Sequence, residues 1–120
     1  MYTIKVISQF SGAHNLRGYK GKCEGLHGHN WQVEVTAASE VLNEMAMVMD
    51  FKDLKEILNG VISVFDHKHL NEIEYFKKIN PTSESIAKYI HNEIVKKIPE
   101  VKIQQVTVWE TESSSAEYSE

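Results

Sequence analysis

Two segments near the N-terminus alternate between apolar and polar residues, the period-2 pattern of a strand with one buried face. Between residues 2 and 14 the apolar side of the pattern holds Ile4, Val6, Phe10 and His14. Between residues 27 and 37 it holds His27, His29, Trp31, Val33, Val35 and Ala37. The intervening residues 15–26 contain three glycines and favour an irregular loop. We therefore expect two long strands, paired antiparallel.

Two later segments repeat apolar residues at helical spacing. The first, residues 51–65, follows Asp50, a suitable capping residue, and its apolar positions are Phe51, Leu54, Leu58, Val61, Ile62 and Phe65. The second follows the cap hydroxyls of Thr82 and Ser83 and stops before Pro99. Its apolar stripe is Ile86, Ile90, Ile94, Val95 and Ile98. The pattern predicts two amphipathic helices.

Shorter apolar segments predict the remaining strands. Residues 48–49 suggest a short strand before the first helix, residues 101–111 a longer one after the second, and residues 113–120 a short edge strand. This order of elements predicts an α+β fold with two helices on one face of an antiparallel sheet. The other face carries Gln32 and Glu34 and is only moderately polar, so we expect it to pack against another subunit.

Length and composition limit the classes of protein to consider. A chain of 120 residues with 42% hydrophobic positions suits a single domain over residues 1–120. Its 13 basic and 17 acidic residues give a net charge of -4, which disfavours nucleic-acid binding. We find neither a run of ~20 apolar residues nor a signal-peptide core, and expect a soluble, cytoplasmic protein without membrane contact. A single cysteine, Cys23, excludes an internal disulfide.

The clearest candidate chemistry is a cluster of three histidines. His27 and His29 project from the same face of a strand, with Cα atoms about 7 Å apart. His14 ends the first strand on the same face, so antiparallel pairing brings it beside the other two. Three neutral imidazoles suit Zn²⁺ with a fourth position open for substrate or water. The alternative is a polar strand end and a His-Gly-His turn without a metal.

Three further sites have both a catalytic and an ordinary interpretation. Cys23 lies four residues before His27, where a nearby cation would favour a thiolate base, but it also fits an incidental thiol or a fourth zinc ligand. Asp66 and His67 form a carboxylate and imidazole pair suited to a proton relay, a pair that also occurs by chance. Glu110 could accept paired N–H donors of a flat heterocycle or be a strand-end charge.

We assign no catalytic or metal-binding role to two more histidines. His69 lies in a loop, and His91 lies in the second helix among Lys88, Asn92 and Lys96, where we expect a solvent-exposed face.

Several motifs together resemble the 6-pyruvoyl-tetrahydropterin synthase and 6-carboxy-tetrahydropterin synthase family. They are Phe10-Ser11-Gly12-Ala13-His14, Cys23-Glu24-Gly25-Leu26-His27-Gly28-His29-Asn30, Asp66-His67-Lys68-His69-Leu70-Asn71, Pro81-Thr82-Ser83-Glu84 and Trp109-Glu110-Thr111. The resemblance covers essentially the whole chain. Its specific part is the His-Gly-His run with an upstream cysteine and a later Asp-His pair, in this order.

The resemblance implies a fold, an assembly and a set of site residues. The implied fold is the tunnelling fold, a four-stranded antiparallel sheet with two helices, in which three subunits close a β-barrel and two trimers form a hexamer with active sites between subunits. The implied zinc ligands are His14, His27 and His29. The implied proton-transfer residues are Cys23, Asp66 and His67. The implied pterin-binding residues are Glu110, Thr82 and Ser83.

The resemblance also implies a zinc-dependent lyase acting on 7,8-dihydroneopterin triphosphate. The three-residue spacer between Cys23 and His27 is similar to that of the bacterial 6-carboxy-tetrahydropterin synthases of queuosine biosynthesis. This favours 6-carboxy-5,6,7,8-tetrahydropterin as product, with release of acetaldehyde and triphosphate. The 6-pyruvoyl product is an alternative.

Glu24 introduces a second alternative. A glutamate directly after the cysteine resembles family members that form 6-hydroxymethyl-7,8-dihydropterin for folate synthesis, so a dual or folate-pathway enzyme with Glu24 as a second acid/base remains open. Glu24 also fits a solvated loop charge. A non-catalytic metal-binding or pterin-binding module is disfavoured because Cys23, Asp66 and His67 are all retained.

Overall fold

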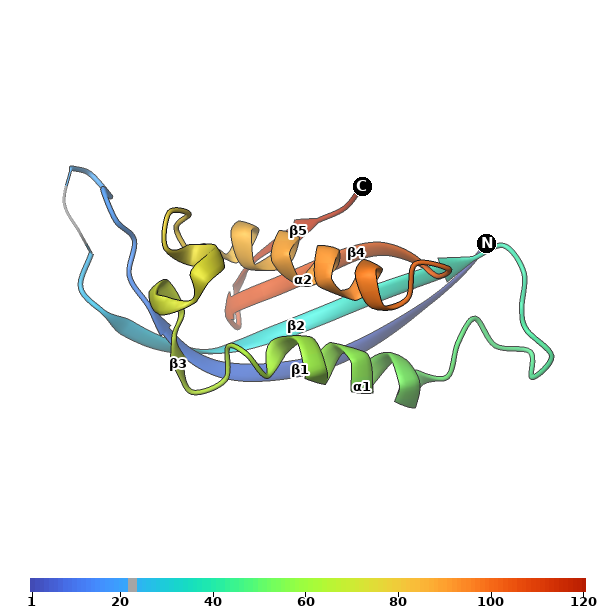
Figure 1. The fold of residues 1–120 in the computed structure, drawn as a ribbon. Coiled ribbons are helices and arrows are strands. Elements are labelled where there is room, and N and C mark those ends of the chain that lie inside the picture. The colour runs from blue at the N-terminus through green and yellow to red at the C-terminus, as the bar shows by residue number, and fades with distance from the viewer. Residues whose placement is uncertain (22–23) are drawn as a thin grey trace.

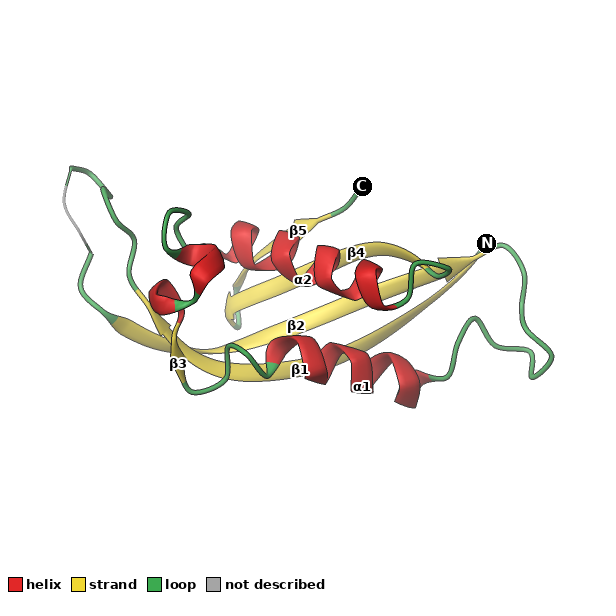
Figure 2. Ribbon diagram, viewed as in Figure 1, coloured by secondary structure: helices red, strands yellow, loops and turns green. Residues whose placement is uncertain are grey.

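The antiparallel part of the sheet is built by four strands in the order β1-β2-β4-β5. The computed structural model describes residues 1–21 and 24–120. The elements are β1 (Tyr2–His14), β2 (His27–Ser39), α1 (Phe51–Ile62), β3 (Lys68–His69), the 3-10 turns η1 (Leu70–Glu72) and η2 (Glu74–Phe76), α2 (Ser83–Lys97), β4 (Lys102–Thr111) and β5 (Ser114–Tyr118). Both α-helices lie on the same face of the sheet, which confirms the α+β architecture (Figure 1, Figure 2).

The sheet has a fifth strand that the sequence pattern did not predict. β3 contains two residues and runs parallel to β1, pairing Gly12 with Lys68 and Ala13 with His69. The absence of a side chain at Gly12 permits this approach, because a Cβ there would lie 3.3 Å from both the Phe65 carbonyl oxygen and Leu70 Cδ2. Backbone close approach of this kind is a common reason for glycine in a strand.

Two predictions about the elements are wrong: one short strand does not form, and the first helix ends earlier than expected. Residues 48–49 form no strand; the preceding residues instead form a turn in which Asn43 Oδ1 accepts hydrogen bonds from the N–H groups of Met45 and Met47. α1 ends at Ile62 rather than at residue 65, and the Ser63 hydroxyl donates to the Gly60 carbonyl at this end. Phe65 is nevertheless fully buried, so the periodicity identified a core residue that lies beyond the helix.

The core lies between the helices and the face of the sheet that the alternation predicted to be buried. Trp31, Val33 and Val35 of β2 are fully buried there. They pack with side chains of both helices, among them Leu54, Leu58, Ile86, Ile90 and Ile94. The Trp31 indole N–H donates to the Gly12 carbonyl (3.1 Å), which satisfies the polar atom of this large buried side chain.

His91 is buried rather than solvent-exposed as we expected. Its side chain is 2% exposed, its Nε2 lies 3.2 Å from the Ile103 carbonyl oxygen, and its ring meets the Tyr118 ring edge-on. The reason is tertiary: α2 packs against β4 and β5 together, so the buried surface of α2 is wider than its apolar stripe.

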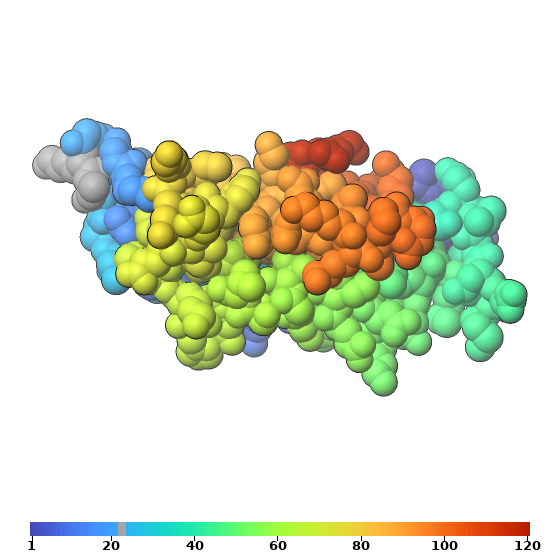
Figure 3. Space-filling model, in the orientation of Figure 1, coloured from blue at the N-terminus to red at the C-terminus, as the bar shows by residue number. Residues whose placement is uncertain are grey.

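The molecule is elongated, with extents of 54 × 27 × 24 Å (Figure 3). The end of β1 and the start of β2 extend beyond the two α-helices, at the side of the molecule where the chain passes from one strand to the other (Figure 1). Residues 41–49 lie at the opposite end of the molecule (Figure 1). Within the described residues, the structure has no helix with the length and apolar character needed to span a membrane.

Gly12→Ala should lower the thermal stability by about 1 kcal/mol, because the added methyl group meets a backbone oxygen that cannot move without displacing the 65–70 segment. Gly60→Ala is the matched control: no atom lies within 4 Å of an added Cβ in this helix, and alanine should stabilise it by roughly 0.5–1 kcal/mol. Thermal denaturation of both variants measures this. Equal shifts of the two melting temperatures would contradict the close approach at Gly12.

Candidate metal centre and active site

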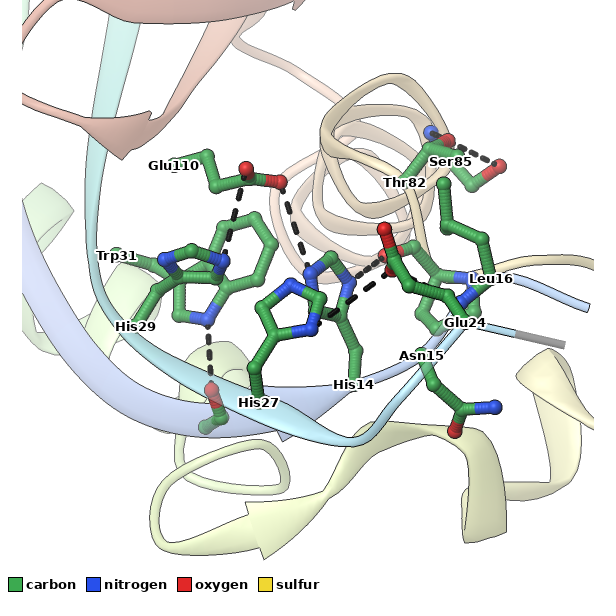
Figure 4. Close-up of polar contacts among 12 residues, drawn as sticks. His14, Asn15, Leu16, Glu24, His27, His29, Trp31, Thr82, Ser85 and Glu110 are labelled. Carbon is green, nitrogen blue, oxygen red and sulfur yellow. Dashed lines mark hydrogen bonds and ion pairs between the residues drawn. The ribbon is translucent and has the colours of Figure 1, made fainter. Parts of the chain in front are cut away.

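Three histidine side chains meet at the end of β1 and β2 (Figure 4). The register pairs His14 directly with His27, and His29 lies two residues further along β2 on the same face. One nitrogen from each ring lies within 4.8 Å of those of the other two. The predicted juxtaposition of the three imidazoles is therefore present in a single chain.

Backbone carbonyls orient two of these rings. His14 Nδ1 lies 2.7 Å from the Pro81 carbonyl oxygen and His27 Nδ1 lies 2.9 Å from that of Gly25. Because a carbonyl only accepts, each Nδ1 must carry the proton, which leaves the Nε2 lone pair of a neutral ring free to bind a metal. This arrangement is typical of metal-ligating histidines.

The inner nitrogens of the cluster lack hydrogen-bond partners. His14 Nε2 and His29 Nε2 are buried and have no hydrogen bond within the described residues. A buried polar atom without a partner costs about 1–3 kcal/mol, which a bound cation would offset. Three imidazoles and an open side are the donor set of catalytic zinc sites, so the residues present fit Zn²⁺.

Burial also favours the metal-binding protonation state. The pKa of His14 lies below its ordinary value, mainly because its buried position disfavours the charged imidazolium, although the Pro81 hydrogen bond and the nearby Glu110 carboxylate act in the opposite direction. A lowered pKa keeps His14 neutral near pH 7, the form that ligates a metal.

Glu110 of β4 faces this cluster (Figure 4). One carboxylate oxygen lies 3.6 Å from His14 Nε2 and the other 3.5 Å from His29 Nε2, both beyond hydrogen-bonding distance. The side chain is 34% exposed, so one edge of the carboxylate remains accessible. The structure thus brings Glu110 of β4 to the histidine cluster.

Asp66 and His67 are held against β1 near the same end of the sheet. The Ser11 N–H donates to Asp66 Oδ1 (3.0 Å), and the His67 N–H donates to the Ser11 carbonyl (2.6 Å). His67 Nδ1 lies 3.1 Å from Asp66 Oδ1, and the His67 side chain is 81% exposed. The backbone of His67 has a φ of 57°, in the left-handed region that residues other than glycine seldom adopt.

The Ser11 N–H is the main reason that the pKa of Asp66 lies below its ordinary value, with a smaller contribution from His67. Asp66 is therefore ionised near neutral pH and suited to orient His67. A surface pocket of about 470 Å³ has His67 and His29 among its lining residues, so one member of the pair and one member of the histidine cluster border the same pocket. Lys68 and His69 line the same pocket, although the sequence gave us no reason to assign them there.

The remaining candidates lie around the cluster, with one exception. Thr82 caps α2, accepting from the Ser85 N–H (3.1 Å), and Ser83 begins that helix. Glu24 Oε1 accepts from the Leu16 N–H (3.3 Å) and lies 3.8 Å from His27 Nδ1. Cys23 lies outside the described residues.

The acceptors that orient the histidines were missed by the sequence analysis. Every residue has a carbonyl oxygen, so nothing in the sequence distinguishes those of Pro81 and Gly25 as partners of His14 and His27. Only the packing of distant segments places them.

Fold and site together define an α+β protein with a cluster of three histidines at one end of its sheet, in a geometry that suits a metal ion. The sequence model of the family described as 6-pyruvoyl tetrahydropterin synthase matches residues 3–120. The chain belongs to this family, and its function is that of a pterin synthase. This confirms the resemblance seen in the motifs.

Individual relatives agree with this assignment. A putative 6-carboxy-5,6,7,8-tetrahydropterin synthase of Archaeoglobus fulgidus is 44% identical over 95% of this chain and 92% of its own length. The 6-carboxy-5,6,7,8-tetrahydropterin synthase of Haemophilus influenzae is 33% identical over the whole of both chains. The 6-pyruvoyl tetrahydrobiopterin synthase of Homo sapiens is 34% identical over 95% of this chain and 81% of its own.

The fold is also similar to that of solved members of this family. The 6-pyruvoyl tetrahydropterin synthase of Caenorhabditis elegans superposes with a TM-score of 0.86 at 28% sequence identity, covering 99% of this chain and 95% of that one. The tunnelling fold expected from the motifs is thereby confirmed, with β3 as the additional short strand.

Asp66→Asn should reduce thermal stability at pH 7 but have little effect at low pH. The pKa of Asp66 is lowered in the folded protein, so its ionised form stabilises the fold above the ordinary value of 3.8, and this contribution disappears as the pH falls through the lowered pKa. Melting temperatures of wild type and variant at pH 7 and pH 3 measure the difference. A gap that is as large at pH 3 as at pH 7 would contradict this role of the carboxylate.

Proposed function

We propose that this pterin synthase is a zinc-dependent carbon–carbon lyase of queuosine biosynthesis. It would convert 7,8-dihydroneopterin triphosphate and water to 6-carboxy-5,6,7,8-tetrahydropterin, acetaldehyde and triphosphate. The observation that supports it most is the pair of buried Nε2 atoms of His14 and His29, which lack partners and converge with His27. The names of the relatives from Archaeoglobus and Haemophilus support the carboxy product.

The proposed metal site would polarise the substrate side chain. Zn²⁺ bound by the three histidines would supply a Lewis acid that acidifies the C–H and O–H groups of that side chain. The protein's contribution is to fix the ring direction and tautomer of His14 and His27 through the Pro81 and Gly25 carbonyls.

Proton transfer is assigned to the Asp66–His67 pair together with Cys23. Asp66 is held by Ser11 and orients His67, whose exposed ring shares a pocket with His29. A fixed carboxylate beside an imidazole determines which ring nitrogen exchanges protons. His67 would remove or return a proton at the side-chain carbons, and Cys23 would do so as a thiolate.

Recognition of the pterin is assigned to Glu110, helped by Thr82 and Ser83. A carboxylate accepts two parallel N–H donors, the pattern that the edge of a pterin ring presents. Glu110 is accessible on one side and adjoins the histidine cluster, so a ring bound there would place its side chain beside the metal. Thr82 and Ser83 lie directly after Pro81, which contacts His14.

The proposed assembly is a hexamer of two trimers, each trimer closing a β-barrel from single-domain subunits in the cytoplasm. One edge of β1 pairs with β2, and the opposite edge pairs with β3 at only two positions. Within the described residues, this opposite edge therefore has no strand partner from Tyr2 to Ser11. The outer edge of β5 is equally open. Unpaired edges favour strand pairing between chains. Large apolar side chains are also exposed, among them Met1, Tyr2, Val41, Met45 and Phe51.

Glu24 supports a second candidate activity, formation of 6-hydroxymethyl-7,8-dihydropterin. Its carboxylate lies 3.8 Å from His27 Nδ1, at the edge of the histidine cluster. A second acid/base at this position could reach the substrate side chain. The 6-pyruvoyl product is a third candidate, supported by the name of the human relative.

We expect purified protein to bind one zinc ion per chain and to lose it on His14→Ala or His29→Ala, because each change removes one of three ligands. His67→Ala is the matched control: it should keep the zinc and lose turnover by about 100-fold or more. Metal analysis after dialysis and a rate assay measure this. Stoichiometric zinc in both ligand variants would refute the assigned site.

The product decides between the candidate activities. Zinc-loaded protein is incubated with 7,8-dihydroneopterin triphosphate, and the pterins are identified by mass spectrometry for wild type, Cys23→Ala and Glu24→Ala. We expect a 6-carboxy product that is lost with Cys23 and retained without Glu24. A 6-hydroxymethyl product that depends on Glu24 would move the assignment to folate synthesis, and a 6-pyruvoyl product to the third candidate. No product at all would leave a binding module.

A further inference from the structure

The segment after His14 is held by carboxamide side chains from two distant parts of the chain. The Asn71 carboxamide accepts from the Asn15 N–H (3.0 Å) and donates to the Asn15 carbonyl (2.8 Å). The Asn80 carboxamide does the same for Arg17, accepting from its N–H (2.9 Å) and donating to its carbonyl (3.0 Å). Each amide thus replaces the partner that a neighbouring strand would provide.

The Asn80 contact closes a ring of interactions around His14. Asn80 is bonded to Arg17, which lies three residues after His14. The next residue, Pro81, provides the carbonyl that accepts from His14 Nδ1 at 2.7 Å. The bonds between Asn80 and Arg17 therefore tie the segment that carries this carbonyl to the segment that follows the imidazole.

Arg17 reinforces the same junction with its side chain. Its guanidinium donates to the carbonyls of Phe76, Lys77 (2.6 Å) and Ile79 (2.9 Å). Its Nε also donates to Asn80 Oδ1 (3.3 Å). The turn that leads into Asn80 is thereby fixed to the segment that follows His14, over a sequence separation of about 60 residues.

We propose that Asn80 is a positioning residue for the metal centre, which acts through the Pro81 carbonyl to fix the ring direction and tautomer of His14. This rests on the proposed function in that it takes His14 as a zinc ligand. Free imidazole exchanges between two tautomers, and the form with a proton on Nε2 has no lone pair on that nitrogen, which is the one that faces the cluster. A fixed carbonyl at Nδ1 selects the other form.

The expected magnitude is that of other contacts to metal-ligating histidines. Loss of such an outer partner typically costs 10–100-fold in metal affinity. Asn80→Ala leaves Pro81, His14 and the guanidinium bonds of Arg17 to the preceding turn in place, but removes the carboxamide bonds that join Arg17 to the residue before Pro81. It should therefore weaken zinc binding within this range. N80D keeps the acceptor for the Arg17 N–H and loses the donor to its carbonyl, so its affinity should fall between wild type and N80A.

Asn43→Ala is the matched control. Asn43 Oδ1 also accepts two backbone N–H groups, but in the turn at the opposite end of the molecule. The two alanine variants should therefore lose similar thermal stability, while only N80A loses zinc affinity, measured by competition with a chromophoric chelator. Zinc affinities of N80A and N43A within twofold of each other would overturn the proposal.

The tautomer of His14 provides a second readout that does not depend on metal. Long-range ¹H–¹⁵N correlation spectra of zinc-free protein at pH 8 should show His14 with its proton on Nδ1 in wild type and a mixture of tautomers in N80A. An unchanged tautomer in N80A would overturn the proposal.

The two proposals can fail separately. If wild type bound no zinc, the proposed metal centre would fail, yet the tautomer of His14 would still test the role of Asn80. If N80A did not fold, N80D with its partial loss would serve in both measurements.

Discussion

The antiparallel register of β1 and β2 is the constraint on which the rest of the site depends. It pairs His14 with His27 and Phe10 with Trp31, so that core residues and candidate ligands share one face of the sheet. A slip of one residue would turn every side chain of a strand to the other face. The long hydrophobic alternation prevents such a slip, because it would expose residues such as Val33 and Val35 to water.

The apolar core continues directly into the histidine cluster. Trp31 is fully buried and meets the rings of His14 and His29 edge-on, with centroids 4.9 Å and 5.3 Å away. Its other contacts are with Phe10 and the Gly12 carbonyl. Close-packed neighbours of this kind limit the rotamers of the imidazoles. The core therefore contributes to the direction of the ligands as well as to stability.

Polar contacts to the cluster come from segments far apart in sequence. The Pro81 carbonyl precedes α2, Glu110 lies on β4, and the Gly25 carbonyl lies on the loop before β2. Asn80 and Arg17 join two of these segments next to His14. The three histidines are thus encoded locally on two strands, whereas the orientation of their rings depends on the packing of segments from the whole chain.

Hydrophobic period and strand geometry are local properties, so the amino-acid sequence was enough to predict the two long strands, both helices and the meeting of His14, His27 and His29. The burial of His91, the pairing of β3 and the carbonyl partners of the histidines became known only from the packed chain. Burial of a helix face depends on what packs against it, and a backbone carbonyl has no identity in sequence. Tertiary packing therefore determines which of the many backbone carbonyls accept hydrogen bonds from the histidine rings.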